Sequence, residues 1–110
     1  TVILNVFRRG QNLSRQVASI KAQTYPVSEF LVWENGEDTS SQPAAKNYHV
    51  SRASKNFGVW ARFGYALNAK SDFIWVIDDD TIPGTEWLEN AINTFQSHPG
   101  VIGFEAFDLE

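Results

Sequence analysis

Two patterns of apolar residues alternate along the chain. Short continuous apolar runs predict strands, and apolar residues three and four positions apart predict helices. The predicted strands cover residues 2–7, 29–33, 47–50 (a short edge strand) and 73–77, with another beginning at 101–104, and the predicted helices cover residues 12–23, 59–69 and 85–97. Elements of these lengths favour βαβ units with parallel strands. The pattern therefore predicts an α/β fold, a Rossmann-like open, mostly parallel twisted sheet with alternating helices.

Turn-forming residues mark the ends of these elements. Pro26 ends the first helix, and Asn35-Gly36 closes the second strand. Thr85 is expected to be the N-cap of the last helix. Residues 37–46 are polar and are predicted to form a loop. Because neither repeats nor a linker interrupt the pattern, we expect a single domain over residues 1–110.

Three consecutive carboxylates follow the strand predicted at 73–77. All five residues of this strand are apolar, which predicts a central strand buried on both faces. Asp78, Asp79 and Asp80 then lie at its carboxyl end, where ligands bind in open parallel sheets. Because neighbouring acids repel one another, a cation such as Mg²⁺ or Mn²⁺ would stabilise them and could share them with a phosphate. The acids predict a metal–nucleotide site, with an acidic surface turn as the alternative.

Two other predicted strands also end in polar residues. Arg8-Arg9 follows the first strand, and Glu34-Asn35 follows the second. If the strands are parallel, these two clusters and the three acids share one edge of the sheet. That edge would supply arginines for phosphate, a carboxylate or amide for a base or ribose, and acids for a metal. A solvated arginine pair and a simple turn at Glu34-Asn35 remain the alternatives.

Composition narrows the classes of partner and compartment. The net charge of −4 argues against nucleic acid or an anionic membrane surface as the main partner. The lack of Cys excludes disulfides, zinc–thiolate sites and thiol nucleophiles, and it fits a reducing compartment. No apolar run approaches the roughly 20 residues of a membrane span. We expect a location in the cytoplasm or at the cytoplasmic face of a membrane.

Missing motifs bear on how a nucleotide could be held. The chain has neither a G-x-G-x-x-G after its first strand nor a Walker-type glycine–lysine loop. Phosphates would therefore be neutralised by a metal held on the acids. No Gly-x-Ser-x-Gly elbow indicates a hydrolase either.

The four tryptophans are expected to serve mainly in packing. Trp33, Trp60 and Trp75 are predicted core residues, and Trp87 is a candidate for contact with an acceptor. In the helix predicted at 59–69, Trp60 shares one face with other apolar residues, and Arg62 lies on another.

The order of these motifs resembles family 2 glycosyltransferases of the GT-A fold. The resemblance rests on SIKAQTYP before the second strand, VWENG at its end, and NFGVWARFGYALNAKSDFIWVIDDDTIPGTEWL from residue 56 onward. It covers nearly the whole chain but only the amino-terminal, nucleotide-binding half of such an enzyme. It implies transfer of a sugar from a UDP- or GDP-sugar to an acceptor, with Mn²⁺ or Mg²⁺ as cofactor.

The resemblance implies roles for several residues at the strand ends. Asn5 and Phe7 match residues that meet the nucleotide base, and Phe7 replaces a common Tyr, which keeps stacking but loses a hydroxyl bond. Glu34 and Asn35 match an acidic pair that bonds the base and ribose. Arg62 matches a basic residue near the nucleotide.

The resemblance also divides the three acids by role. Asp78, Asp79 and Asp80 cover the Asp-x-Asp motif, and the family pattern implies that the earlier acids contact the ribose or metal. Asp80 is the implied main metal ligand, with Asp78 beside it. With Arg8 for phosphate, these residues form the predicted nucleotide-sugar site.

The general base and the acceptor site are not identified in the sequence. Only 30 residues follow Asp80, and the late acids Glu105, Asp108 and Glu110 show no spacing that marks a base. We therefore expect a fragment of a longer enzyme with little or no transfer activity alone. The alternatives are an incomplete nucleotide-binding or interaction module, able to form homo-oligomers through an unfinished sheet edge, and a nucleotidyltransferase.

Overall fold

In the part of the chain that the structure describes, four parallel strands form a single open sheet. The computed structural model describes residues 1–36 and 48–103. The strands are β1 (Val2–Val6), β2 (Phe30–Glu34), β3 (His49–Arg52) and β4 (Trp75–Asp78). They lie in the order β3-β2-β1-β4, and every neighbouring pair is parallel. The predicted α/β class and the predicted parallel sheet are confirmed, and β3 is the edge strand expected near residues 47–50.

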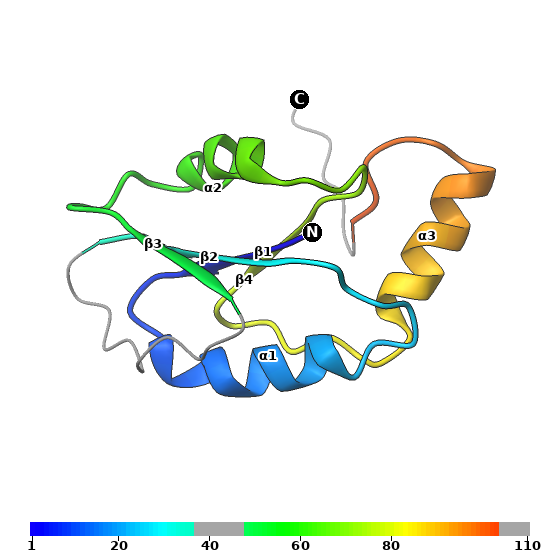
Figure 1. Ribbon diagram of the computed structural model, residues 1–110, viewed down its shortest axis with the longest axis horizontal. Coiled ribbons are helices and arrows are strands. Elements are labelled where there is room, and N and C mark those ends of the chain that lie inside the picture. The colour runs from blue at the N-terminus through cyan, green and yellow to red at the C-terminus, as the bar shows by residue number, and fades with distance from the viewer. Residues whose placement is uncertain (37–47, 104–110) are drawn as a thin grey trace, which may run out of the picture.

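Helices cover both faces of this sheet. They are α1 (Leu13–Lys21) with the preceding 3₁₀ turn η1 (Gly10–Asn12), α2 (Ala61–Tyr65) continued by the 3₁₀ turn η2 (Ala66–Asn68), and α3 (Trp87–Ser97). Figure 1 shows α1 along one face of the sheet and α2 along the other, with α3 at the right of the view, beside the sheet. The alternation of strands and helices in the sequence thus becomes a three-layer arrangement.

The alternation of side chains along β1 builds two separate cores. On the face covered by α1, Val2 and Leu4 of β1 pack with Val17 and Ile20. On the opposite face, Ile3 packs with residues of β2 and α2. Since successive side chains of a strand point to opposite faces, a strand that is apolar throughout can be covered on both. The residues of β1 are all buried.

The strand before the acids differs from its prediction. β4 begins at Trp75 rather than Phe73, and it lies at an edge of the sheet among the described residues. Phe73 and Ile74 precede it and are exposed, and of its own residues only Ile77 is buried. The expectation of a central strand buried on both faces was wrong, because within residues 1–36 and 48–103 β4 has one neighbouring strand where β1 has two. Association of copies through the free side of β4 stays a prediction.

Some of the tryptophans pack in the interior, and one is exposed. Trp33 and Trp75 are half-buried and pack against the two cores, as expected. Trp60 is exposed, so its predicted place in the core was wrong. The side of α2 that faces the sheet is occupied by Arg62 and Tyr65 instead. Helical spacing identifies which residues lie on the same side of a helix, but it does not determine which side packs against the sheet.

A buried glutamine joins the end of α1 to the start of α3. The Gln23 Nε2 group donates to the Gly84 carbonyl at 2.6 Å, and its Oε1 accepts from the Leu88 N–H at 2.9 Å. The N-cap position of α3 is Glu86, which makes no capping bond with its side chain, so the predicted Thr85 cap was wrong. A side chain distant in sequence supplies the acceptor that a local cap normally provides.

Some expectations fall outside the described residues. These are the loop predicted at 37–46, the late acids Glu105, Asp108 and Glu110, and the end of the strand predicted at 101–104. Across residues 1–36 and 48–103, no helix is long and apolar enough to cross a membrane.

The Gln23 linkage leads to a prediction about stability. Gln23→Ala leaves the Leu88 N–H without its side-chain acceptor and leaves the Gly84 carbonyl with only the Trp87 N–H, at 3.3 Å. It should therefore lower the free energy of unfolding by about 1–3 kcal/mol. Gln11→Ala, at an exposed position of η1, should change it by less than about 0.5 kcal/mol. Urea unfolding followed by circular dichroism measures both. Equal effects of the two substitutions would contradict the proposed role of Gln23.

Candidate functional site

The carboxyl ends of β1, β2 and β4 meet around one pocket. This pocket has a volume of about 240 Å³. It is lined by Asn5, Phe7, Arg9, Asn35, Asn56, Gly58, Val59, Arg62, Asp78, Asp79 and Asp80. The parallel order of the strands brings these segments together, because their carboxyl ends lie at the same edge of the sheet.

The middle acid, Asp79, is tied into the protein. Its side chain is only 8% exposed, and its Oδ2 accepts from the Phe7 backbone N–H at 2.7 Å. The Asn12 side chain donates to the Asp79 carbonyl at 2.9 Å. These bonds join the turn after β4 to the end of β1 and the start of α1. Asp79 therefore fixes the position of the acidic segment.

The two outer acids are more exposed, and each is paired with an arginine. The Asp78 side chain is 47% exposed and that of Asp80 is 60% exposed. Asp78 pairs with Arg62 of α2 and also accepts from the Asn5 amide at 3.0 Å. Asp80 pairs with Arg9 at 2.7 Å. The two exposed acids therefore flank the buried one in the sequence.

A buried glutamine of α1 holds the backbone of the acidic segment by hydrogen bonds. The Gln16 side chain is fully buried, and its Nε2 donates to the Asp78 carbonyl at 2.6 Å and to the Thr81 carbonyl at 3.0 Å. Both carbonyls belong to the turn that carries the acids. The backbone of this turn is thus held by α1, while the outer carboxylates face the pocket.

Asn35 holds the loop on the other side of the pocket. Its Nδ2 donates to Asn56 Oδ1 at 2.9 Å and to the Gly58 carbonyl at 3.0 Å, and its Oδ1 accepts from the Phe57 N–H at 2.9 Å. Gly58 has a φ of +72°, which glycine adopts without the strain of a side chain. The Asn35 amide is therefore engaged at both ends in positioning the loop that leads into α2.

Two residues expected at the site lie away from this pocket. Glu34 is buried, and its carboxylate pairs with Arg52 of β3. Arg8 is exposed, with a φ of +65°, and its guanidinium lies 4.8 Å from the centre of the Phe7 ring. Neither lines the pocket. A positive φ is uncommon outside glycine, so the chain turns sharply where β1 ends.

Two polar atoms at the pocket lack partners in the described part of the chain. Asn5 Oδ1 and Arg62 Nε are buried without a hydrogen bond. Buried polar groups are nearly always bonded, so one unpaired acceptor and one unpaired donor at the pocket leave hydrogen-bonding capacity for a ligand. Both residues also contact Asp78 through their other atoms.

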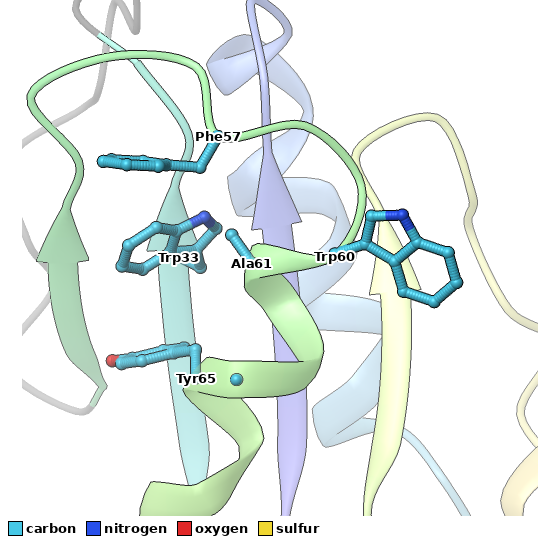
Figure 2. A pocket seen from close by; sticks show the side chains of 6 residues that line it. Trp33, Phe57, Trp60, Ala61 and Tyr65 are labelled. Atoms are coloured by element: carbon cyan, nitrogen blue, oxygen red, sulfur yellow. The ribbon is translucent and has the colours of Figure 1, made fainter.

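A second, larger pocket is aromatic and contains none of the acids. Its volume is about 490 Å³, and it is lined by Trp33, Phe57, Trp60, Ala61, Gly64 and Tyr65. Figure 2 shows the Phe57, Trp33 and Tyr65 rings one above another, with the Trp60 ring pointing away from them. Trp33 and Tyr65 have ring centres 5.3 Å apart. The loop held by Asn35 thus contributes residues to both pockets.

The carboxylate oxygens of the pocket suit a hard divalent cation whose remaining coordination positions are filled by a substrate. Within residues 1–36 and 48–103, no three His, Cys, Asp or Glu side chains form a ready-made metal cage. The carboxylates of Asp79 and Asp80 nevertheless converge on a single cationic nitrogen, Nη1 of Arg9. Mg²⁺ usually takes one or two carboxylates and completes its shell with phosphates and water. The acids therefore fit a divalent cation bound together with a nucleotide.

Sequence reasoning did not identify several residues that build the site. Asn56 and Gly58 were quoted only as part of the stretch that carries the family resemblance, and Gln16 and Asn12 were not singled out. Gln16 interrupts the apolar stripe of α1, between Leu13 and Ile20 at helical spacing. A polar residue in an apolar stripe is the signal that could have identified it.

The sequence matches a known family over nearly its whole length. The model of the family described as Glycosyl transferase family 2 matches residues 1–105. Glycosyltransferase AglE of Haloferax volcanii is 25% identical over 104 residues, which cover 86% of this chain and 34% of AglE.

Solved structures show the same fold. S. aureus TarS 1-349, also solved in complex with UDP, superposes with a TM-score of 0.66 at 20% identity, over 88% of this chain and 32% of that one. The full TarS structure gives the same TM-score at 21% identity over 19% of its length. This chain therefore spans about a third of AglE and of TarS 1-349.

The Arg9–Asp80 pair leads to a prediction about pH. The hydrogen bond from Arg9 holds the pKa of the Asp80 carboxyl below its ordinary value of 3.8. Because the folded pKa is lowered, the pair is present above that ordinary value and is lost as the pH falls through the folded pKa. Carbon-13 NMR titration should give an Asp80 pKa below 3.8, and Arg9→Gln should raise it.

A matched substitution tests whether the effect is local. Arg15→Gln removes the same charge from an exposed position of α1 and should leave the titration of Asp80 unchanged. An Asp80 carboxyl that titrates alike in all three chains would contradict the ion pair.

Proposed function

The chain belongs to glycosyl transferase family 2, and on that premise we propose that it is the donor-binding portion of a metal-dependent glycosyltransferase. The observation that carries this proposal is the pocket at which exposed carboxylates, the two arginines Arg9 and Arg62, and unpartnered polar atoms lie together. Its ligand would be a nucleoside diphosphate sugar, and a UDP-sugar is favoured because TarS was solved with UDP.

The proposed metal ligands are Asp80, as the main one, and Asp78. These two side chains are the exposed members of the acidic segment, and Asp79 is engaged in holding that segment to β1. The family typically uses a divalent metal. Bound Mn²⁺ or Mg²⁺ would act as a Lewis acid that offsets the charge of the leaving nucleoside diphosphate.

The proposed nucleotide contacts come from the pocket and its rim. Phe7 offers a ring for stacking on a base, and Asn5 and Arg62 offer the unpartnered acceptor and donor. Asn35 would act mainly through the loop that it holds. Glu34 and Arg8 remain proposals from the family pattern, and each would have to reach the ligand from outside the pocket lining.

We also propose that the 110-residue chain does not complete the reaction by itself. Sugar transfer with inversion needs a base within hydrogen-bond reach of the acceptor hydroxyl. Each acid of the pocket is paired with an arginine or a backbone N–H, and the late acids lie outside the described residues. The base and the acceptor site would then come from sequence that the longer relatives possess. The family match favours this proposal over a nucleotidyltransferase.

Metal-dependent nucleotide binding tests the proposal. UDP or GDP should bind more tightly with Mn²⁺ than with EDTA, because a metal held by Asp80 and Asp78 would offset the charge of the diphosphate. Asp80→Ala should abolish that difference, since it removes the main proposed ligand. Isothermal titration calorimetry with both nucleotides measures the effect.

Controls separate metal binding from general charge effects. Asp72→Ala removes an exposed carboxylate outside the pocket and should leave the Mn²⁺-dependent gain in place. A panel of nucleotide sugars assayed for hydrolysis and transfer should show little or no turnover by the isolated chain. Absence of metal-dependent binding for any nucleoside diphosphate would refute the proposal.

A further inference from the structure

We propose that Arg9 is a built-in counter-cation of the acidic segment, which the metal displaces from Asp80 and which then binds the diphosphate. This inference rests on the proposed function, since it describes how the same pocket accepts its ligand. By this inference Arg9 weakens the binding of the metal alone and strengthens the binding of the metal–nucleotide complex. The sequence predicted the Arg8-Arg9 pair for phosphate, with Arg8 as the site residue, and gave Arg9 no role toward the metal.

Arg9 occupies the position at which the acids converge. Its Nη1 lies 2.7 Å from Asp80 Oδ2 and 3.4 Å from Asp79 Oδ1. One nitrogen thus donates to oxygens of two carboxylates. A divalent cation bound to Asp80 would compete with this guanidinium for the same oxygen atoms. The metal and Arg9 cannot both keep the contacts that Arg9 makes here.

The geometry of Arg9 allows it to leave without unfolding the segment. Its carbonyl accepts from the Asn12 N–H at 3.0 Å, at the start of η1, which fixes its backbone. Its side chain is 51% exposed, and Asp80 is more exposed still. Exposed ion pairs contribute little to stability, because water competes with them. Asp79 keeps its bond to the Phe7 N–H, so the acidic segment stays in place.

The second arginine of the pocket provides a contrast. The Arg62 side chain is only 12% exposed, and it faces Asp78 from α2. Removing the partner of a buried charge is costly, whereas an exposed pair exchanges readily. Arg9 is therefore the arginine that exchanges. A guanidinium carries five N–H donors in a planar fork, which suits two phosphate oxygens.

The experiment compares two affinities in the same variant. In Arg9→Gln, Mn²⁺ alone should bind about two- to fivefold more tightly, because its competitor is gone. UDP in saturating Mn²⁺ should bind about tenfold more weakly, because a charge-assisted contact to phosphate is lost. Electron paramagnetic resonance measures free Mn²⁺, and calorimetry measures UDP. Changes in opposite directions are the expected result.

A matched variant and a second measurement keep the test decisive. Arg15→Gln loses the same charge and should move neither affinity by more than about twofold, since distant exposed charges are screened. In the unsubstituted chain, Mg²⁺ should shift the guanidinium NMR signals of Arg9 more than those of Arg62. Unchanged Mn²⁺ affinity in Arg9→Gln relative to Arg15→Gln would overturn the inference, and so would an unmoved Arg9 signal.

The outcomes also separate this inference from the proposed function. If the unsubstituted chain binds no nucleoside diphosphate in Mn²⁺, the proposed function fails. A tighter Mn²⁺ site in Arg9→Gln would then still support the displacement of Arg9 from Asp80. If UDP binds with metal but Arg9→Gln binds it unchanged, the proposed function stands and the role of Arg9 at the diphosphate is refuted.

Discussion

The mutual repulsion of three consecutive carboxylates is the constraint on which the site depends. A fold can place Asp78, Asp79 and Asp80 together only if their charges are compensated. Here the compensation comes from three directions: a backbone N–H at the end of β1, Arg9 just after it, and Arg62 from α2. The contacts of the acids therefore hold β1, β4 and α2 close together, and the pocket lies between these elements.

In the same arrangement, one acid has a structural role and the other two are available to a ligand. Asp79 is buried and bonded to backbone, and it behaves as part of the scaffold. Asp78 and Asp80 keep exposed oxygens beside cationic side chains that already hold them in position. Gln16 fixes the backbone of the turn that carries the acids. A ligand that replaces an arginine at a carboxylate therefore need not reorganise this turn. Such preorganisation lowers the cost of binding.

The fold and part of the site could be predicted from the sequence because their signals are local. Continuous apolar runs such as Val2–Val6 mark strands, and their alternation with amphipathic helices leaves a parallel sheet as the simplest solution. Parallel strands then require that Arg9, Asn35 and the acids share one edge. That inference needed only the chain order and the direction of the strands.

Side-chain direction and pairing were decided by the tertiary structure. The sequence marked an arginine pair after β1, yet a backbone with positive φ at Arg8 turns Arg8 toward the Phe7 ring and Arg9 toward the acids. Likewise Trp60 is exposed and Arg62 lies inward, because the partner available on that side of the sheet is Asp78. Periodicity and residue type are properties of a short stretch of chain, and they determined the elements. The partner of a charged side chain depends on segments as much as 73 residues away, so only the folded chain could decide it.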